Sequence, residues 1–257
     1  MLSIITSIKN PDINLFLDKL EIYRILVKNG LILEWVIQDH DKSSKIGAYI
    51  ADIPFISYES KEDSGIYQAW NRALSRARGD KICFLGIDDM PVSNWIKFVD
   101  TFKLRDNQAI TCNVQMLSEG VPVGVRFSPN IGFVDLSRIR YAHPGFVFSS
   151  VIYNNAKFDE SYSIISDGLF YSNLGPIKIV GCFDEIGVLM NTGGISNSVR
   201  GSRRRFIELF RAFRFNDIAR NLSNIKGIVA SLPAFIFSFL PLPIFRRLQR
   251  ARWRFFK

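Results

Sequence analysis

Two adjacent carboxylates, Asp88 and Asp89, follow the apolar run Lys81–Leu85, which is typical of a buried strand. Carboxylate oxygens are the hard ligands that Mg²⁺ and Mn²⁺ prefer, above all where substrate phosphates complete the coordination shell. Aspartate is also common in turns that end strands, so the pair alone allows a purely structural role. The sequence therefore offers Asp88 and Asp89 as candidate metal ligands at a strand end.

Polar residues follow two further expected strands. Ser7–Asn10 comes at the end of the strand Leu2–Ser7, and Asp39–Ser43 follows the strand Leu31–Gln38. Parallel α/β sheets bind their ligands at the carboxyl ends of the strands. A binding site is expected where these polar clusters meet the carboxylate pair.

The elements that position these residues alternate along the first 90 residues. One helix is expected between Asn10-Pro11-Asp12, a start signal, and Gly30, and the clearest helix is Gly65–Arg78 with Gly79 as its stop. Expected strands flank both helices. They are Leu2–Ser7, Leu31–Gln38, Phe55–Tyr58 and Lys81–Leu85. The alternation predicts an α/β fold with a doubly wound, mainly parallel sheet.

The pattern changes further along the chain. Ala109–Val134 carries short apolar runs broken by Gly and Pro, as in hairpins. A short helix is expected at Asp167–Leu174, where Asp167 could serve as the helix cap. Two short strands are expected at Ile177–Val180 and Val188–Met190.

The C-terminal segment has a composition of its own. Of the net charge of +9, residues 200–257 contribute +12 from 14 Lys and Arg against two acidic residues, which leaves −3 for the rest. The same segment holds ten of the 22 phenylalanines, and Gly227–Phe245 carries no charge but three prolines. Basic and aromatic residues together favour an anionic membrane surface over nucleic acid, and the prolines favour lying on the membrane over spanning it.

The sequence lacks the signature motifs of several other classes of protein. The sequence has no GxGxxG, GxxxxGK[ST], HExxH or GxSxG pattern, and its three cysteines form no CxxC pair. The odd number and wide spacing of the cysteines favour a reducing cytosol. The N-terminus has no basic region and too short an apolar run for the pattern of a signal peptide.

The stretch from Asp63 to Asp89 resembles family 2 glycosyltransferases of the bacterial polysaccharide type. These enzymes carry a D-x-G-I-Y-D-A-x-N helix, a G-D turn and an F-L-x-x-D-D strand end, with Gln68 here in place of the usual Asp of the helix. The matching residues are Asp63, Gly65, Ile66, Tyr67, Ala69, Asn71, Gly79, Asp80, Phe84, Leu85, Asp88 and Asp89. The resemblance covers roughly residues 2–198, while the usual D-G-x-S-x-D donor loop is altered to Asp39–Ser44.

The resemblance implies a GT-A fold, a Rossmann-like α/β domain over residues 1–199. The composition sets off a basic tail over 200–257. The resemblance also implies a metal, Mg²⁺ or Mn²⁺, held by Asp89 with Asp88, and Asp167 as the base that activates an acceptor hydroxyl. His143 is a weaker candidate on the acceptor side. The implied donor-binding residues are Ser7, Asp39, Asp63, Tyr67, Asn71 and Asp88.

The expected function is that of an inverting glycosyltransferase using a nucleotide sugar, with a UDP-sugar suggested by the resemblance. The expected acceptor is a glycan hydroxyl, on a polyprenyl-diphosphate-linked glycan of O-antigen or capsule synthesis. The expected place is the inner face of the cell membrane, attached peripherally from the cytoplasm through the tail, and no nucleic acid partner is expected. The alternative is a non-catalytic nucleotide- or glycan-binding protein at the membrane surface.

Overall fold

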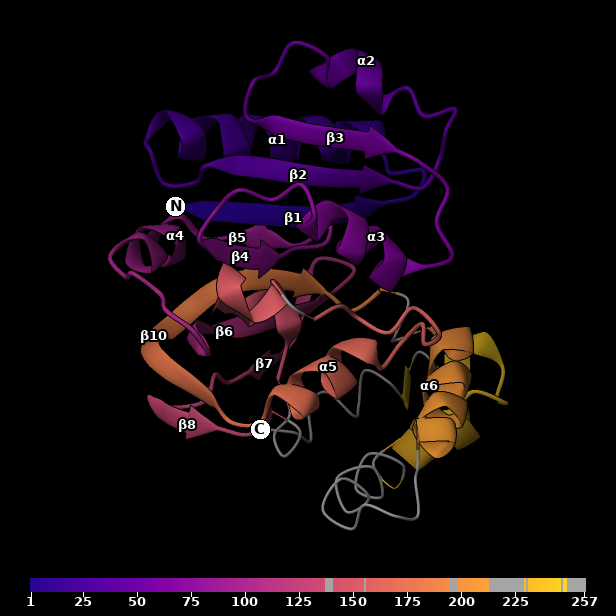
Figure 1. Cartoon of the computed structure of the whole chain (residues 1–257). Coiled ribbons are helices and arrows are strands. Elements are labelled where there is room, and N and C mark those ends of the chain that lie inside the picture. The colour runs from indigo at the N-terminus through magenta and orange to yellow at the C-terminus, as the bar shows by residue number, and fades with distance from the viewer. Residues whose placement is uncertain are drawn as a thin grey trace.

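The computed structural model describes residues 1–136, 141–154, 156–194, 198–212, 229, 231–245 and 247–248. The described residues form one ten-stranded sheet in which eight strands follow the order β3-β2-β1-β4-β9-β6-β10-β5, while β7 pairs with β6 and β8 pairs with β10 (Figure 1). The strands are Leu2–Ile8 (β1), Glu34–Asp39 (β2), Ile56–Ser60 (β3), Lys81–Phe84 (β4), Met90–Pro91 (β5), Gln108–Ser118 (β6), Val121–Arg126 (β7), Gly132–Val134 (β8), Phe146–Ser149 (β9) and Ile177–Asn191 (β10).

The sheet is mixed rather than mainly parallel. Strands β3, β2, β1 and β4 all run parallel, as the alternation of strands and helices predicts. Beyond β4 the neighbouring strand β9 is antiparallel to both β4 and β6. Among the described residues, four strand pairs are parallel and five antiparallel, so the α/β class is confirmed. Three of the parallel pairs join the N-terminal strands, and the fourth joins β6 to β10.

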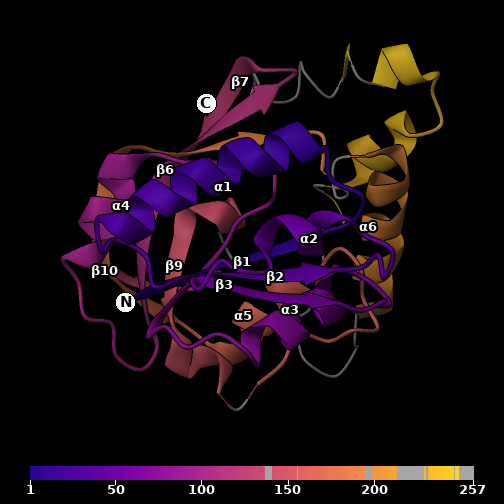
Figure 2. The ribbon, with the colours of Figure 1, turned by 90° about the horizontal axis from the view of Figure 1, so that it is seen from above.

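Helices cover both faces of the sheet (Figure 2). The helices are Ile13–Lys28 (α1), Ile46–Ile50 (α2), Ile66–Leu74 (α3), Ser93–Asp100 (α4), Ser166–Leu174 (α5) and Val199–Ala212 (α6), with 3₁₀ turns at His143–Gly145 (η2) and Ser150–Tyr153 (η3). On one face Phe16 of α1 and Trp95 of α4 share a core with Trp35. On the other face Tyr67 of α3 and Tyr171 of α5 form a second core. The central strands are therefore buried on both sides, which explains their almost continuous apolar sequences.

Helix α1 begins and ends where the sequence predicts. The Asp12 side chain accepts hydrogen bonds from the backbone N–H groups of Asn14 (2.8 Å) and Leu15 (3.2 Å), so it caps the helix. Gly30 has a φ of +70°, a left-handed conformation that suits glycine after the last turn.

Helix α3 ends four residues before the predicted Arg78, at Leu74. Gly79 therefore does not end the helix, contrary to the prediction, but is required by a close contact with β1. A Cβ there would lie 2.5 Å from Ser3 Oγ and 2.8 Å from the backbone oxygen of Met1, so only glycine lets this turn approach β1.

The last strand, β10, joins two segments that were expected to be separate. Ile177–Asn191 is one strand that pairs with β6 through three shifts of register, the last between Ile186 and Val188. Such bulges let a strand continue through residues that do not fit the alternating pattern. The predicted hairpin is confirmed by β6 and β7, which pair antiparallel.

The predicted boundary between the α/β domain (1–199) and the tail (200–257) falls inside helix α6, which starts at Val199. The division into these two parts stays a prediction. Residues 231–237 form a further helical segment, and its Phe235 ring stacks on Phe206 of α6 with centroids 4.4 Å apart. No helix among the described residues is long and apolar enough to cross a membrane. Part of the predicted membrane segment Gly227–Phe245, namely 227, 228 and 230, lies outside the described residues.

Candidate functional site

The ends of β1 and β2 bring Ser7 and Asp39 next to each other. Ser7 pairs with Gln38 and the following residue pairs with Asp39, so both predicted donor residues lie at one edge of the sheet. The Asp39 carboxylate is fully buried and accepts hydrogen bonds from Tyr58 Oη and the backbone N–H of Asp41, each at 3.0 Å. Asp39 therefore fixes the start of the loop that follows β2.

Asp63 lies against the same loop. Its Oδ1 accepts a hydrogen bond from the N–H of Gly65 (3.1 Å) and lies 3.2 Å from Nδ1 of His40. The side chain of Asp63 is 6% exposed, and its Oδ2 is a buried oxygen without a hydrogen-bond partner among the described residues. A buried acceptor without a partner is costly unless a ligand or water satisfies it.

Asp88 and Asp89 follow β4, at the same edge of the parallel strands. Asp89 Oδ2 accepts a hydrogen bond from the N–H of Gly86 at 2.7 Å, which folds the turn back on itself. Asp89 is 5% exposed, and burial, with the neighbouring charge of Asp88, raises its pKa to about 6. Two adjacent carboxylates in this setting repel each other, and a cation would relieve that repulsion.

Lys19 of α1 lies beneath this turn, although its sequence position gave no signal of a functional role. Its Nζ donates hydrogen bonds to the backbone oxygens of Gly86 (2.8 Å) and Asp89. Burial lowers the pKa of Lys19 to about 8, while the charges of Asp89 and Asp88 oppose that shift. The one available signal was spacing, because Lys19 lies in register with the buried Phe16 and Tyr23 of α1.

The chemistry of Asp88 and Asp89 fits a hard divalent cation. Among the described residues no group of three or more His, Cys, Asp and Glu side chains could hold a metal. The pair would therefore supply only two carboxylates and leave the remaining positions to water and substrate phosphate, which is the usual arrangement for Mg²⁺.

Tyr67 of helix α3 contacts the C-terminal half of the chain. Tyr67 Oη donates a hydrogen bond of 2.9 Å to Oδ1 of Asp167, which lies 100 residues away in sequence. Burial, and then the charge of Asp167, raise the pKa of the Tyr67 hydroxyl well above its usual 10.0, so it stays protonated and remains a donor. Two of the predicted residues are thus in direct contact.

Asn71, one turn further along α3, uses its amide within the protein. Its Nδ2 donates to the backbone oxygen of Phe158 and to Glu160 Oε1, each at 2.9 Å, and its Oδ1 accepts from the N–H of Phe158 at 3.0 Å. Gln68 adds a bond to Glu160 Oε2 at 2.7 Å. These contacts fasten α3 to the segment that leads to α5.

Asp167 is the second residue of α5 and not its cap, because the helix begins at Ser166 after Ile165. Its Oδ1 accepts hydrogen bonds from Tyr67 and from the N–H of Gly168 (2.9 Å). Both of these hydrogen bonds go to Oδ1 rather than Oδ2, and the residue is only partly buried. Two hydrogen bonds thus hold Oδ1 of Asp167 in place.

His143 lies inside the protein rather than on an open surface. Its Nε2 is 2.7 Å from Tyr171 Oη, and its ring stacks on Phe84 with centroids 5.0 Å apart. Burial lowers its pKa to about 4, although the charge of Asp167 opposes the shift, so the imidazole is neutral at pH 7. The acceptor-side role of His143 stays a prediction, and this placement gives it no direct support.

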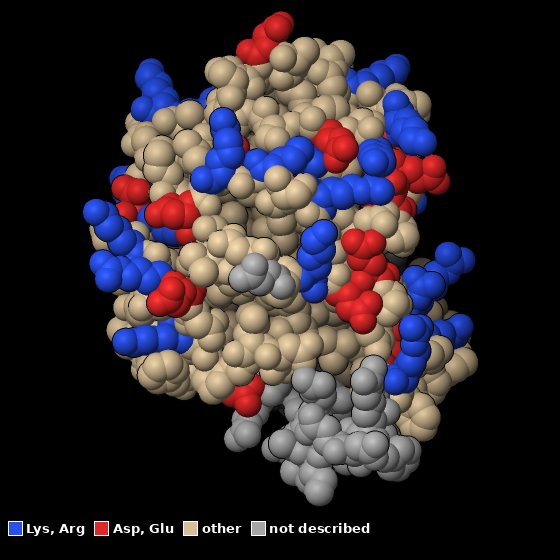
Figure 3. Space-filling view, in the orientation of Figure 1, with Lys and Arg blue, Asp and Glu red and all other residues tan. Residues whose placement is uncertain are grey.

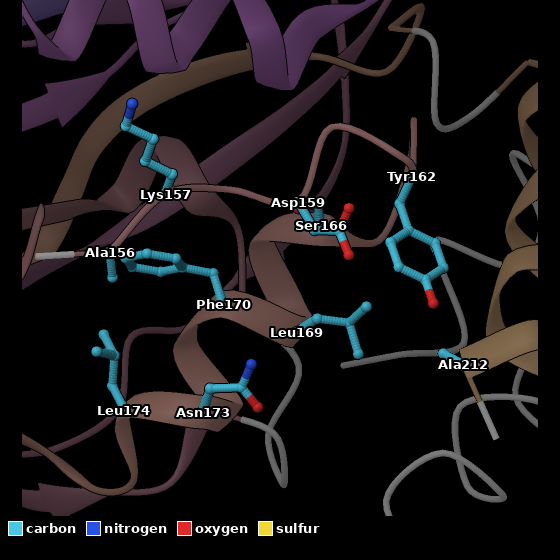
Figure 4. A pocket seen from close by; sticks show the side chains of 10 residues that line it. All are labelled: Ala156, Lys157, Asp159, Tyr162, Ser166, Leu169, Phe170, Asn173, Leu174 and Ala212. Atoms are coloured by element: carbon cyan, nitrogen blue, oxygen red, sulfur yellow. The ribbon is translucent and has the colours of Figure 1, made fainter. Parts of the chain in front are cut away.

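A cavity of about 320 Å³ lies along α5, on the side that faces α6 (Figure 4). Ser166 lies in its wall, and its buried Oγ has no hydrogen-bond partner among the described residues. The lining residues are Ala156, Lys157, Asp159, Tyr162, Ser166, Leu169, Phe170, Asn173, Leu174 and Ala212. The cavity is next to Asp167 in sequence and on another face of the same helix.

Basic side chains gather over α6, to the right in Figure 3. Ile207 and Phe210 of the same helix are 60% and 68% exposed. Arg203 turns toward the segment 231–237 and its next residues, where it donates to Ser238 Oγ (3.0 Å) and stacks over the Phe239 ring. The outer side of α6 thus combines cations with exposed apolar side chains.

No family model matches the chain, and no curated protein matches it by sequence. Solved structures do resemble it. The crystal structure of TarS of S. aureus matches with a TM-score of 0.53 at 18% identity, over 93% of this chain and 44% of TarS. TarS 1–349 matches with a TM-score of 0.54 at 15% identity, and TarS 1–349 in complex with UDP-GlcNAc matches with a TM-score of 0.53 at 14% identity, each over 98% of this chain and 89% of the other.

The chain spans less than half the length of the first of these structures. TarS is a glycosyltransferase with a GT-A-like fold, and the match extends over nearly the whole of the present chain. At these identities the likeness concerns the fold alone. This chain has the fold of a GT-A-like glycosyltransferase.

Proposed function

We propose that the chain is a family 2 type, inverting glycosyltransferase that transfers a sugar from a nucleotide sugar to an acceptor hydroxyl. The observation that carries the proposal is the hydrogen bond between Tyr67 and Asp167. It joins the half of the molecule that holds Asp88 and Asp89 to the half that holds the candidate base. TarS has been crystallised with UDP and with UDP-GlcNAc, which supports a UDP-sugar as donor here.

The donor would lie at the edge formed by β1, β2 and β4. The unpartnered Oδ2 of Asp63 offers an acceptor for an N–H or hydroxyl of the nucleoside. Ser7 and Asp39 line the same edge. Asp88 and Asp89 would hold Mg²⁺ or Mn²⁺, which supplies positive charge beside the diphosphate leaving group.

Asp167 would act as the general base. As the acceptor oxygen attacks the anomeric carbon, its proton passes to the carboxylate of Asp167, and the bond from that carbon to the diphosphate oxygen breaks. Displacement from the face opposite the leaving group inverts the anomeric centre. Tyr67 holds one oxygen of Asp167, which leaves the other to receive the proton.

The acceptor in this proposal is a glycan, linked to a polyprenyl diphosphate and destined for a surface polysaccharide. The exposed Ile207 and Phe210, among the arginines of α6, support peripheral attachment to the cytoplasmic face of a membrane.

The first test is calorimetry with UDP, GDP and dTDP, with and without Mn²⁺, on the wild type and Asp89→Ala. Metal-dependent binding of one nucleotide, lost in Asp89→Ala, is expected. Sugars of that nucleotide are then screened for transfer with Asp167→Asn and, as a matched surface control, Asp52→Asn. Asp167→Asn should lower kcat by about 100- to 10,000-fold with nucleotide affinity kept. Full activity of Asp167→Asn would exclude it as the base, and nucleotide binding without any transfer would favour the non-catalytic alternative.

The membrane attachment is tested by co-sedimentation with vesicles of phosphatidylglycerol or of phosphatidylcholine alone. The wild type should bind the anionic vesicles, and the double variant Ile207→Ser/Phe210→Ser should bind them less. Deletion of residues 225–257 should weaken binding further. Equal binding of all three proteins would contradict attachment through the tail.

A further inference from the structure

Glu208 of α6 is a buried carboxylate that accepts four hydrogen bonds from one short segment, Ser163–Ile165. The residue is 7% exposed. Its Oε1 accepts hydrogen bonds from the N–H (2.8 Å) and the Oγ (2.7 Å) of Ser163. Its Oε2 accepts from the N–H groups of Ile164 (2.9 Å) and Ile165 (3.3 Å). Bonds to a charged acceptor are stronger than neutral ones, so the four together hold this segment firmly.

The segment leads directly into α5 and Asp167. Ile165 is the cap residue of the helix, and its side chain forms no capping hydrogen bond. A carboxylate at a helix N-terminus satisfies free N–H groups and interacts favourably with the helix dipole. Glu208 supplies a carboxylate from a different helix. Of the N–H groups that it binds, that of Ile165 belongs to the cap residue, those of Ser163 and Ile164 precede it, and Asp167 follows two residues after Ile165.

Packing around Glu208 joins α6 to the residues that precede α5. Leu209 and Ala212 of α6 pack with Ile164 and Ile165 in a small hydrophobic cluster. The guanidinium of Arg211 lies 5.3 Å from the centre of the Tyr162 ring. The start of α5 is therefore positioned by α6, which lies almost entirely in the segment whose composition suggested only a membrane tail.

We propose that Glu208 is a positioning residue, which holds the start of α5 so that Asp167 faces its substrate. This role rests on the proposed function, because it matters only if Asp167 takes the acceptor proton. It makes α6 part of the catalytic unit. The same helix exposes Ile207 and Phe210 on another side.

The test uses the full chain and the variants Glu208→Gln, Asp167→Asn and the double variant, with Glu21→Gln as control. Glu21 is an exposed glutamate that accepts a hydrogen bond from Arg24 on the same helix. Glutamine keeps the size of Glu208 but replaces one accepting oxygen with an NH₂ group, so bonds on one side of the segment are lost. UDP affinity is measured by calorimetry, and kcat and KM by release of UDP from the sugar donor.

Glu208→Gln should lower kcat by about 10- to 100-fold, since small misplacements of a reacting group have effects of this size. UDP affinity should stay within about twofold, because the donor edge is not touched. In the background of Asp167→Asn, the same change should alter kcat by less than about twofold, because two residues that act as one unit are not additive. Glu21→Gln should behave as the wild type.

Wild-type kcat in Glu208→Gln would overturn the proposal. An equal loss of rate with and without Asp167→Asn, or a parallel loss of UDP affinity, would also overturn it, since Glu208 would then support the fold in general. If the wild type transfers no sugar at all, the proposed function fails first and the positioning role fails with it. That outcome is distinct, because wild type and Asp167→Asn would then be indistinguishable.

Discussion

Replacing His143 with phenylalanine is expected to remove a large part of the acid sensitivity of the fold. The imidazole is buried between Phe84 and Tyr171, and its pKa is lowered from 6.5 to about 4. The folded protein therefore binds fewer protons at this site than the unfolded chain does between these two pH values. Stability from the neutral histidine is complete above pH 6.5 and is lost as the pH falls toward 4.

The size of the effect follows from the two pKa values. Between pH 7 and pH 5, the free energy of unfolding should fall by about 2 kcal/mol through His143 alone, and by about 3 kcal/mol on reaching pH 4. Asp89 acts in the opposite direction, because its pKa is raised to about 6, so the folded state gains stability as that carboxyl is protonated. The contribution of Asp89 is common to wild type and variant and cancels in their difference.

The assay is urea unfolding at pH 7, 6 and 5, followed by tryptophan fluorescence, since Trp70 lies 5.1 Å from the His143 ring. The stability difference between wild type and His143→Phe should change by about 2 kcal/mol over this range. The chain has two histidines, and His40→Gln, measured in the same way, separates the contribution of the other one. A difference that stays constant from pH 7 to pH 5 would refute the conclusion that His143 is buried and neutral.

Three further changes test the contacts around α3 and β1. Asn71→Ala should destabilise the protein by about 1–3 kcal/mol in urea unfolding, because it leaves the N–H and oxygen of Phe158 unpaired, and nucleotide affinity should change little. Gly79→Ala should cost about 1–3 kcal/mol in the same assay, because the new methyl group would meet Ser3 and the backbone of β1. Tyr67→Phe removes the hydroxyl that holds the candidate base, and kcat should fall about tenfold without loss of UDP affinity; unchanged kcat would contradict that role.

The strands of the parallel half could be predicted because their sequences leave little choice. Residues such as Trp35 and Ile37 are fully buried, so each strand appears as an apolar run followed by a polar turn. Strand β10 was divided in two because Asp184 and Glu185 interrupt its apolar pattern, while the pairing with β6 continues past them through bulges. Pairing between distant strands is not encoded in local periodicity.

Helix ends depend on partners that the local sequence does not show. The apolar pattern of α3 continues to Arg78, yet regular helix stops at Leu74. Arg76 instead donates to Gln38 Oε1 (2.8 Å) and to Glu59 Oε2 (2.6 Å), contacts with β2 and β3. Tertiary hydrogen bonds have overridden the local preference for helix.

The candidate site was predicted to the extent that it lies in a short motif. The motif supplied Tyr67 and, through the resemblance, Asp167, but their direct contact depends on how α3 and α5 meet. Neither Lys19 nor Glu208 belongs to a recognisable motif. A charged residue in a helix is ordinarily expected to face solvent, so nothing in the sequence singled them out. Their importance appears only when the fold buries them against the backbone of Gly86 and Ser163.

The side-chain contacts of α3 have a consequence for exchanging parts between related chains. Three residues of this helix bind the segment from Phe158 to Asp167, through the contacts of Tyr67, Gln68 and Asn71. A chimera joined after β4 would keep α3 from one parent and its binding segment from the other, and these contacts would be mismatched. Exchange of the C-terminal half would therefore preserve these contacts only if α3 came from the same parent, although α3 lies in the N-terminal half of the sequence.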